Sequence, residues 1–182
     1  MDHAEDDGDD IDDVFIYMGG DQEVPEDVTH VRVHKSVKII RAGAFYDCIN
    51  LVTIEMHDGV EIIEEEAFYN CYALRGIKLP GVRVIEERAF YECTSLRNIK
   101  LPGVRVIEHG AFWGCRALED VEFGNKLDTI GFEAFRSTAL RNVKLTKVRI
   151  IGTCAFWGCK QLTEVELLSK DLEGIGGAAL AY

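Results

Sequence analysis

The chain repeats itself every 22 or 23 residues, and this period constrains the fold more than any other feature. The motif L-x-x-[IV]-x-[LFM], in which x is any residue, begins at Leu51, Leu74, Leu96, Leu118, Leu140 and Leu162, with a degenerate copy at Val28. The ten residues IKLPGVRVIE even occur twice, at 77–86 and 99–108. A period of about 20 to 30 residues predicts a solenoid, in which each repeat forms one turn and stacks on the next.

Each repeat also predicts its own secondary structure. Apolar and polar residues alternate from Leu96 to Leu101, which is typical of a strand with one buried face. A second motif, I-x-x-x-A-F-x-x-C, places Ala-Phe pairs at 44–45, 67–68, 89–90, 111–112, 134–135 and 155–156. We expect it to form a helix of about two turns. The predicted fold is therefore an α/β solenoid, with a parallel sheet of about seven strands on its concave side and short helices on its convex side.

One irregular copy indicates which part of the repeat is fixed. The segment from Phe123 to Ile130 is one residue longer than its counterpart, and the segment from Phe135 to Leu140 is one residue shorter. The two changes cancel, so the strand motif returns on schedule. We therefore expect the strands to keep a common register while the outer arc adapts.

The repeats resemble the BspA-type leucine-rich repeat, as in AFYDCINLVTIEMHDGVEII and AFYECTSLRNIKLPGVRVIE, and the likeness extends over about residues 28–180. The resemblance implies a right-handed leucine-rich-repeat solenoid. It also implies a general role in protein–protein interaction or adhesion, and it brings no catalytic site. We accordingly expect a protein that is not an enzyme.

Charge divides the chain into a leader and a neutral body. Residues 1–30 hold 12 of the 32 acidic side chains and no Lys or Arg, so the other 20 acids balance the 20 bases. Residues 1–13 are predicted to be a disordered acidic leader. Residues 14–27 are expected to form an N-terminal cap strand and turn, and residues 28–182 the solenoid. This charge distribution argues against a nucleic-acid partner, and no apolar run approaches the ~20 residues of a membrane span.

The last repeat is incomplete, because the sequence stops inside its expected helix without a polar capping unit. Solenoids need capped ends for solubility. End-to-end association through this uncapped C-terminal repeat is therefore one expectation.

Five of the six cysteines, at 48, 71, 93, 115 and 159, share one repeat position. One inward Cys per turn does not suit a pairwise disulfide framework, and a free Cys packs as a small hydrophobe. Unpaired cysteines and a start unlike a signal peptide favour an intracellular site.

Two motifs raise the question of a cofactor, and we predict none. His34 and His57 occupy matching positions with Asp58 nearby, which could hold a metal, although histidines at strand ends are common. GIGGAA at 174–179 matches a dinucleotide-binding fingerprint but lacks the helix and strand that should follow it.

The concave sheet is our candidate for a protein-binding surface. One column across the strands alternates mostly in sign, which could simply stabilise the ladder. Together with its neighbours it makes a banded surface suited to a partner of complementary charge. The expected contacts are Arg75, Lys78, Arg97, Lys100, Glu119, Asp120, Glu122, Arg141 and Lys144.

An aromatic column on the convex side offers the alternative. It runs Tyr46, Tyr69, Tyr91, Trp113, Arg136 and Trp157. These rings could simply lie on one another. Otherwise they form a ridge that binds a partner through Tyr69, Tyr91, Trp113 and Trp157, in a structural or adhesive segment of a larger surface protein.

Overall fold

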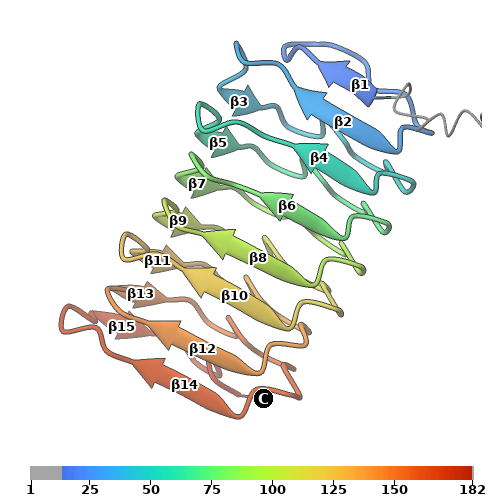
Figure 1. Cartoon of the computed structure of the whole chain (residues 1–182). Coiled ribbons are helices and arrows are strands. Elements are labelled where there is room, and N and C mark those ends of the chain that lie inside the picture. The colour runs from blue at the N-terminus through green and yellow to red at the C-terminus, as the bar shows by residue number, and fades with distance from the viewer. Residues whose placement is uncertain (1–13, 182) are drawn as a thin grey trace, which may run out of the picture.

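The computed structural model describes residues 14–181 and shows a coil of stacked rungs, each contributing one long and one short strand (Figure 1). The rungs are built from the repeats in order, so the strands alternate between two parallel sheets. The acidic leader predicted at residues 1–13 lies outside the described residues.

The first sheet, here called the long-strand sheet, confirms that the leucine motifs form neighbouring parallel strands. Its order is β1-β2-β4-β6-β8-β10, and β12-β14 continue it, since the amide of Arg141 donates to the carbonyl of Glu119 at 3.3 Å. The strands are β1 (Val14–Tyr17), β2 (His30–Val33), β4 (Thr53–Glu55), β6 (Gly76–Lys78), β8 (Asn98–Leu101), β10 (Asp120–Phe123), β12 (Asn142–Leu145) and β14 (Glu164–Leu167). Seven of these strands come from the repeats, and β1 adds one before them.

The second sheet, the short-strand sheet, is continuous over seven strands. They are β3 (Ile39–Ile40), β5 (Ile62–Ile63), β7 (Val84–Ile85), β9 (Val106–Ile107), β11 (Thr129–Ile130), β13 (Ile150–Ile151) and β15 (Gly174–Ile175). Thr129 in the irregular repeat pairs with both Val106 and Ile150, so this sheet keeps its register there. The long-strand ladder is interrupted at the same repeat, between β10 and β12.

A column of phenylalanines fills the space between the two sheets. Each ring stacks on the next, with centroids 5.0 to 5.4 Å apart and planes within 7° of parallel, from Phe45 to Phe156. The separation is close to the ~4.8 Å between neighbouring strands. The stack therefore follows directly from one Phe per rung in a common register. Tyr17 of β1 is fully buried and lies against Phe45 at 5.0 Å.

The Ala-Phe segments are not helices, and this part of the predicted fold is wrong. No helix occurs in residues 14–181, and hence none that could cross a membrane. The segments form arcs of consecutive turns in which amides alternate between two kinds of acceptor. The amide of Tyr69 donates within its own arc to Glu66, whereas the amide of Phe68 donates to Ala89 of the next rung at 2.8 Å.

Left-handed backbone explains why the arc does not become a helix. Glu66 has a φ of 54° and Asn70 a φ of 57°, and most rungs carry left-handed residues at the same two positions. Such residues interrupt a right-handed helix and cost about 1–2 kcal/mol each when they are not glycine. They turn alternate amides toward the neighbouring rung, where hydrogen bonds offset that cost.

The repeated cysteines form a buried column of free thiols, as expected from their spacing. The thiols of Cys71, Cys93 and Cys115 each donate to the carbonyl of the Phe in the preceding rung at 3.1 Å. In the irregular rung Thr138 occupies this position, and its hydroxyl lies 3.1 Å from the Cys159 sulfur. The column thus supplies small side chains that satisfy buried carbonyls.

Gly152→Ala should destabilise the stack, because a Cβ at Gly152 would lie 2.5 Å from the Gly131 carbonyl carbon and the Phe132 amide nitrogen. Both atoms belong to backbone, so two rungs must separate. We expect the free energy of unfolding, measured with urea, to fall by about 2 kcal/mol. Gly174→Ala is the matched control, since its Cβ meets no atom within 4 Å. Equal effects of the two substitutions would contradict the close rung contact.

Stability should fall steeply in alkali. Burial raises the pKa of Cys48 to about 12 and raises the pKa values of Cys93, Cys115 and Cys159 above the ordinary range. Above about pH 9 the unfolded chain therefore loses thiol protons that the folded chain keeps. Each buried thiol should lower the free energy of unfolding by about 1.4 kcal/mol per pH unit.

The comparison of Cys115→Thr with the parent chain checks this expectation, because Thr138 already occupies the same position in another rung. Between pH 9.5 and 11 the free energy of unfolding of the variant should fall less steeply with pH than that of the parent chain. The difference in slope should correspond to one proton, or about 1.4 kcal/mol per pH unit. Identical slopes for the two proteins would show that the thiol is not protected by the fold.

Candidate functional site

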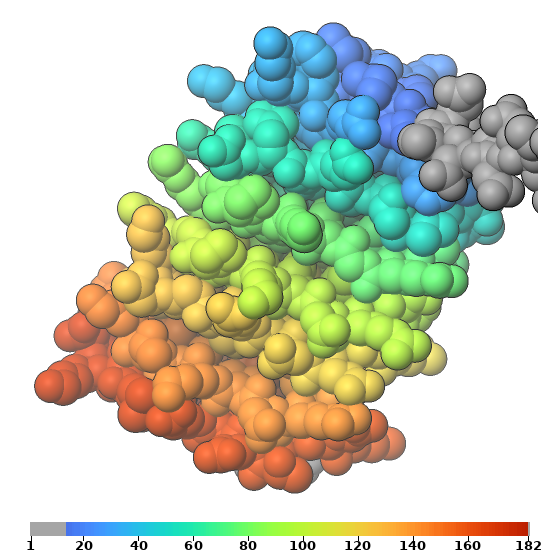
Figure 2. All heavy atoms as spheres, viewed as in Figure 1, coloured from blue at the N-terminus to red at the C-terminus, as the bar shows by residue number. Residues whose placement is uncertain are grey.

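Strand alternation decides which side chains cover the outward face of the long-strand sheet. Ile77, Ile99 and Val121 point into the core, and the residues beside them point to solvent. All nine predicted contact residues are exposed there. The rungs cross the face as successive bands of side chains, from the N-terminal to the C-terminal end (Figure 2).

Ion pairs between neighbouring rungs account for part of the charge on this face. Arg32 contacts Glu55 at 2.7 Å. The other pairs are Lys100–Glu122 at 2.6 Å, Arg141–Glu119 at 3.0 Å and Lys144–Glu166 at 2.8 Å. The hydrogen bond and charge of Glu122 raise the pKa of Lys100. Because these pairs are exposed, they contribute little to stability.

Four cations form a patch in which the alternation of charge fails. Lys78 lies opposite Lys100 in the ladder, and the amide of Arg97 donates to the Arg75 carbonyl at 3.4 Å. Arg75, Lys78 and Arg97 make no ion pair with another residue of the described range. We call these four residues the basic block. Like charges opposite each other destabilise a ladder, so stacking does not explain them.

A hollow of about 810 Å³ opens beside the basic block, over β4, β6 and β8. The hollow was not predicted from the sequence. Gly76 could have indicated it, because this glycine stands in a column of mostly polar residues that have side chains. Its lining combines apolar groups with two lysines: Ile54, Glu55, Met56, Gly76, Ile77, Lys78, Leu79, Pro80, Asn98, Lys100 and Pro102.

The aromatic column forms a continuous stack along the arcs. Tyr69 lies parallel to Tyr46 at 4.8 Å and to Tyr91 at 4.6 Å, and Trp113 meets Tyr91 edge-on at 5.1 Å. Mutual packing thus covers much of these rings, although Tyr46 and Trp157 remain 46% and 42% exposed.

Arg136 continues the column as its one non-aromatic member between Trp113 and Trp157. Its guanidinium carbon lies 4.8 Å from the Trp113 ring centroid and 4.3 Å from that of Trp157. On the inner side it pairs with Glu133, which is 6% exposed. A cation held between two aromatic faces and a buried carboxylate acts as a structural clamp.

Arg136→Gln should cost about 3 kcal/mol in unfolding free energy, because it leaves the Glu133 carboxylate buried without a counter-ion. Tryptophan emission should change as well, since both tryptophans of the chain contact Arg136. Arg141→Gln is the control: it breaks only an exposed pair and should cost less than about 1 kcal/mol. Similar small losses for both variants would rule out the clamp.

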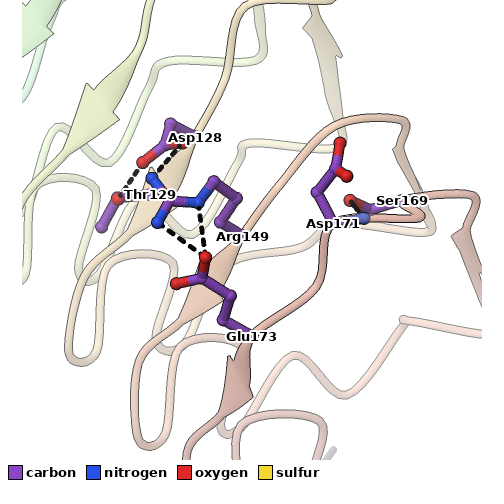
Figure 3. A network of polar contacts seen from close by, with 6 residues as sticks. All are labelled: Asp128, Thr129, Arg149, Ser169, Asp171 and Glu173. Carbon is purple, nitrogen blue, oxygen red and sulfur yellow. Dashed lines mark hydrogen bonds and ion pairs between the residues drawn. The ribbon is translucent and has the colours of Figure 1, made fainter.

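A third charged cluster lies at the edge of the short-strand sheet (Figure 3). Arg149 bridges two rungs, contacting Asp128 at 3.4 Å and Glu173 at 2.7 Å, and the bond to Glu173 raises its pKa. The same column carries Arg83 and Arg105 as neighbours. Charge alternation therefore fails here too at the duplicated segment.

Neither cofactor motif forms a site. His57 donates from Nε2 to the His34 carbonyl at 3.1 Å and accepts at Nδ1 from the Gly59 amide at 3.0 Å, so both ring nitrogens are used. Within residues 14–181 no three His, Cys, Asp or Glu side chains gather closely enough to hold a metal. Gly176 allows two neighbouring rungs to approach closely, because a Cβ there would lie 2.2 Å from the Thr153 amide nitrogen.

A family comparison agrees with this repeat geometry. The family model described as BspA type leucine rich repeat region, with six copies, matches residues 25–106 and 83–182. The chain belongs to the BspA-type leucine-rich-repeat family. The long-strand sheet is thus built from the leucine motifs of BspA-type repeats and the arcs from their Ala-Phe segments.

Two solved structures are similar to this BspA-type chain. The leucine-rich repeat protein of T. pallidum is 29% identical over 90% of this chain and 78% of its own, with a TM-score of 0.74. A leucine-rich cell surface protein of Faecalibacterium prausnitzii is 30% identical over 79% of this chain, with a TM-score of 0.71. The match spans 40% of the F. prausnitzii protein. No curated protein matches the chain, and these comparisons give no support to the expected intracellular site.

Proposed function

We propose that this BspA-type solenoid is a non-enzymatic recognition module that binds a protein partner through the outward face of its long-strand sheet. The observation that carries the proposal is the basic block. Its like charges oppose stacking, three of its four members have no ionic partner among the described residues, and it borders a partly apolar hollow. An acidic protein surface would supply the missing counter-charges.

The composition of the hollow supports a protein partner over a small ion. Its solvent-facing apolar groups are Met56, Pro80 and Pro102, which lie in the same lining as the two lysines, whereas the apolar residues of the strands themselves point into the core. Interfaces between proteins combine such an apolar centre with a polar rim. A simple anion would use only the cations.

Charge reversal tests the proposal. Lys78→Glu with Arg97→Glu should slow association with a partner captured from the native source by at least tenfold at low salt, with a smaller effect at high salt. The control reverses Lys147 and Lys170, which are exposed and lie away from the basic block, so the net charge changes equally. Equal association rates for both double variants would contradict recognition through the basic block.

The aromatic ridge supports a second candidate, in which the chain is an adhesive segment of a larger surface protein. Its support is the exposure of Tyr46 and Trp157 together with the similarity to a protein described as a cell surface protein. Tyr69→Ala separates the two candidates. It should leave partner binding unchanged if the sheet face is used and weaken it if the ridge is used.

A further inference from the structure

Gly76 leaves an opening that the fold does not require. The same place in the other rungs holds a side chain in each case: His30, Thr53, Asn98, Asp120, Asn142 and Glu164. A Cβ at Gly76 would meet no atom within 4 Å, and its φ is not left-handed. Neither close packing nor backbone conformation therefore explains this glycine, whereas a larger residue would cover the hollow.

The rim of this hollow is cationic. Lys78 and Lys100 line it directly, while Arg75 and Arg97 immediately precede β6 and β8 at the edge where these strands begin. Glu55 is the one acid in the lining, and its carboxylate is engaged by Arg32 at 2.7 Å. The site thus suits an extended segment with several carboxylates, whose aliphatic and backbone atoms pack on the solvent-facing parts of Met56, Pro80 and Pro102.

Such a segment is tethered to the same edge of the sheet. Residues 1–13 contain eight acidic side chains and no Lys or Arg: Asp2, Glu5, Asp6, Asp7, Asp9, Asp10, Asp12 and Asp13. They lead into Val14, the first residue of β1. The register runs from Val14 through His30 and Thr53 to Gly76. Since neighbouring strands lie about 4.8 Å apart, Val14 and Gly76 are separated by about 14 Å.

The length of the leader suits this distance. An extended chain advances about 3.3 Å per residue, so Asp10 can reach about 13 Å from Val14 and Asp6 about 26 Å. A short tether of this kind gives an effective concentration in the millimolar range. Weak individual carboxylate contacts are then sufficient for occupancy.

We infer that the acidic leader, residues 1–13, binds the hollow over Gly76 and the basic block as an internal ligand. This inference rests on the proposed function in using the same surface, and it identifies the ligand class as an extended acidic polypeptide. An outside partner must then displace the leader, and its recognised segment must also be acidic.

Binding of a fluorescent peptide of residues 1–13, measured by anisotropy, tests the inference without an outside partner. The receptor is the full chain with Asp6, Asp7, Asp9 and Asp10 changed to Asn, so that its own leader competes weakly. This receptor should bind the peptide at least tenfold more tightly than the unaltered chain does. Adding Lys78→Glu and Arg97→Glu to the receptor should weaken peptide binding at least tenfold. Adding Gly76→Thr instead should weaken it about threefold. The control pair Lys147→Glu and Lys170→Glu should change the peptide affinity less than twofold.

Absence of peptide binding to the neutralised chain, or binding indifferent to Lys78→Glu and Arg97→Glu, would overturn the inference. So would equal affinities for the neutralised and unaltered chains, because the leader would then not compete. The titration is repeated with the chain diluted tenfold, and the peptide affinities of the neutralised and unaltered chains are compared again. A constant ratio of these affinities supports binding of the leader within its own molecule. A ratio that falls on dilution shows that the leader binds a second copy, and it overturns the inference. Either result leaves recognition of an outside partner by the same face open to its own test.

Discussion

Hydrogen bonds between the arcs of neighbouring rungs are the interaction on which the rest of the structure depends. In every described arc except the last, alternate amides donate to the next rung, as from Phe90 to the Ala111 carbonyl at 2.7 Å. The left-handed residues that aim these amides are unfavourable in an isolated chain. A single rung therefore has neither its hydrogen-bond acceptors nor a closed core, and the phenylalanine and thiol columns form only when rungs stack.

The stacking of rungs in one register also determines which charged side chains lie next to each other on the surface. Because equivalent residues of successive repeats lie next to each other, a duplicated stretch of sequence becomes a pair of identical neighbours in space. Across most rungs this juxtaposition joins opposite charges, as in Lys144–Glu166 and Arg149–Glu173. Over the duplicated decapeptide it joins Lys78 to Lys100 and Arg83 to Arg105. The common register therefore places the two lysines of the basic block side by side, although their repulsion does not stabilise the sheet.

The period, the parallel strands and the inward Phe and Cys positions could be predicted from sequence, because one register fixes them all. The arcs could not. A-F-x-x-C has the spacing of a helical face, and the residues Glu66 and Asn70 do not by themselves indicate left-handed backbone. The glycines at the same two repeat positions, Gly43, Gly110, Gly114 and Gly158, were the available signal. The candidate surface was predictable as a set of exposed charges on the sheet. Which charges remain unpaired depends on side-chain geometry, and the hollow depends on one glycine whose neighbours are visible only in the stack. The position of Arg136 between two rings is likewise a three-dimensional property, which its place in the column does not reveal.

Through-hydrogen-bond scalar coupling in a ¹⁵N,¹³C-labelled sample is the most direct test of the arc architecture. We predict a coupling between the Phe90 amide nitrogen and the carbonyl carbon of Ala111, one rung ahead, with equivalent couplings from Phe68 to Ala89 and from Phe112 to Ala134. A coupling from Phe90 to Glu86, the acceptor four residues back in a helix, would contradict hydrogen bonding between neighbouring arcs.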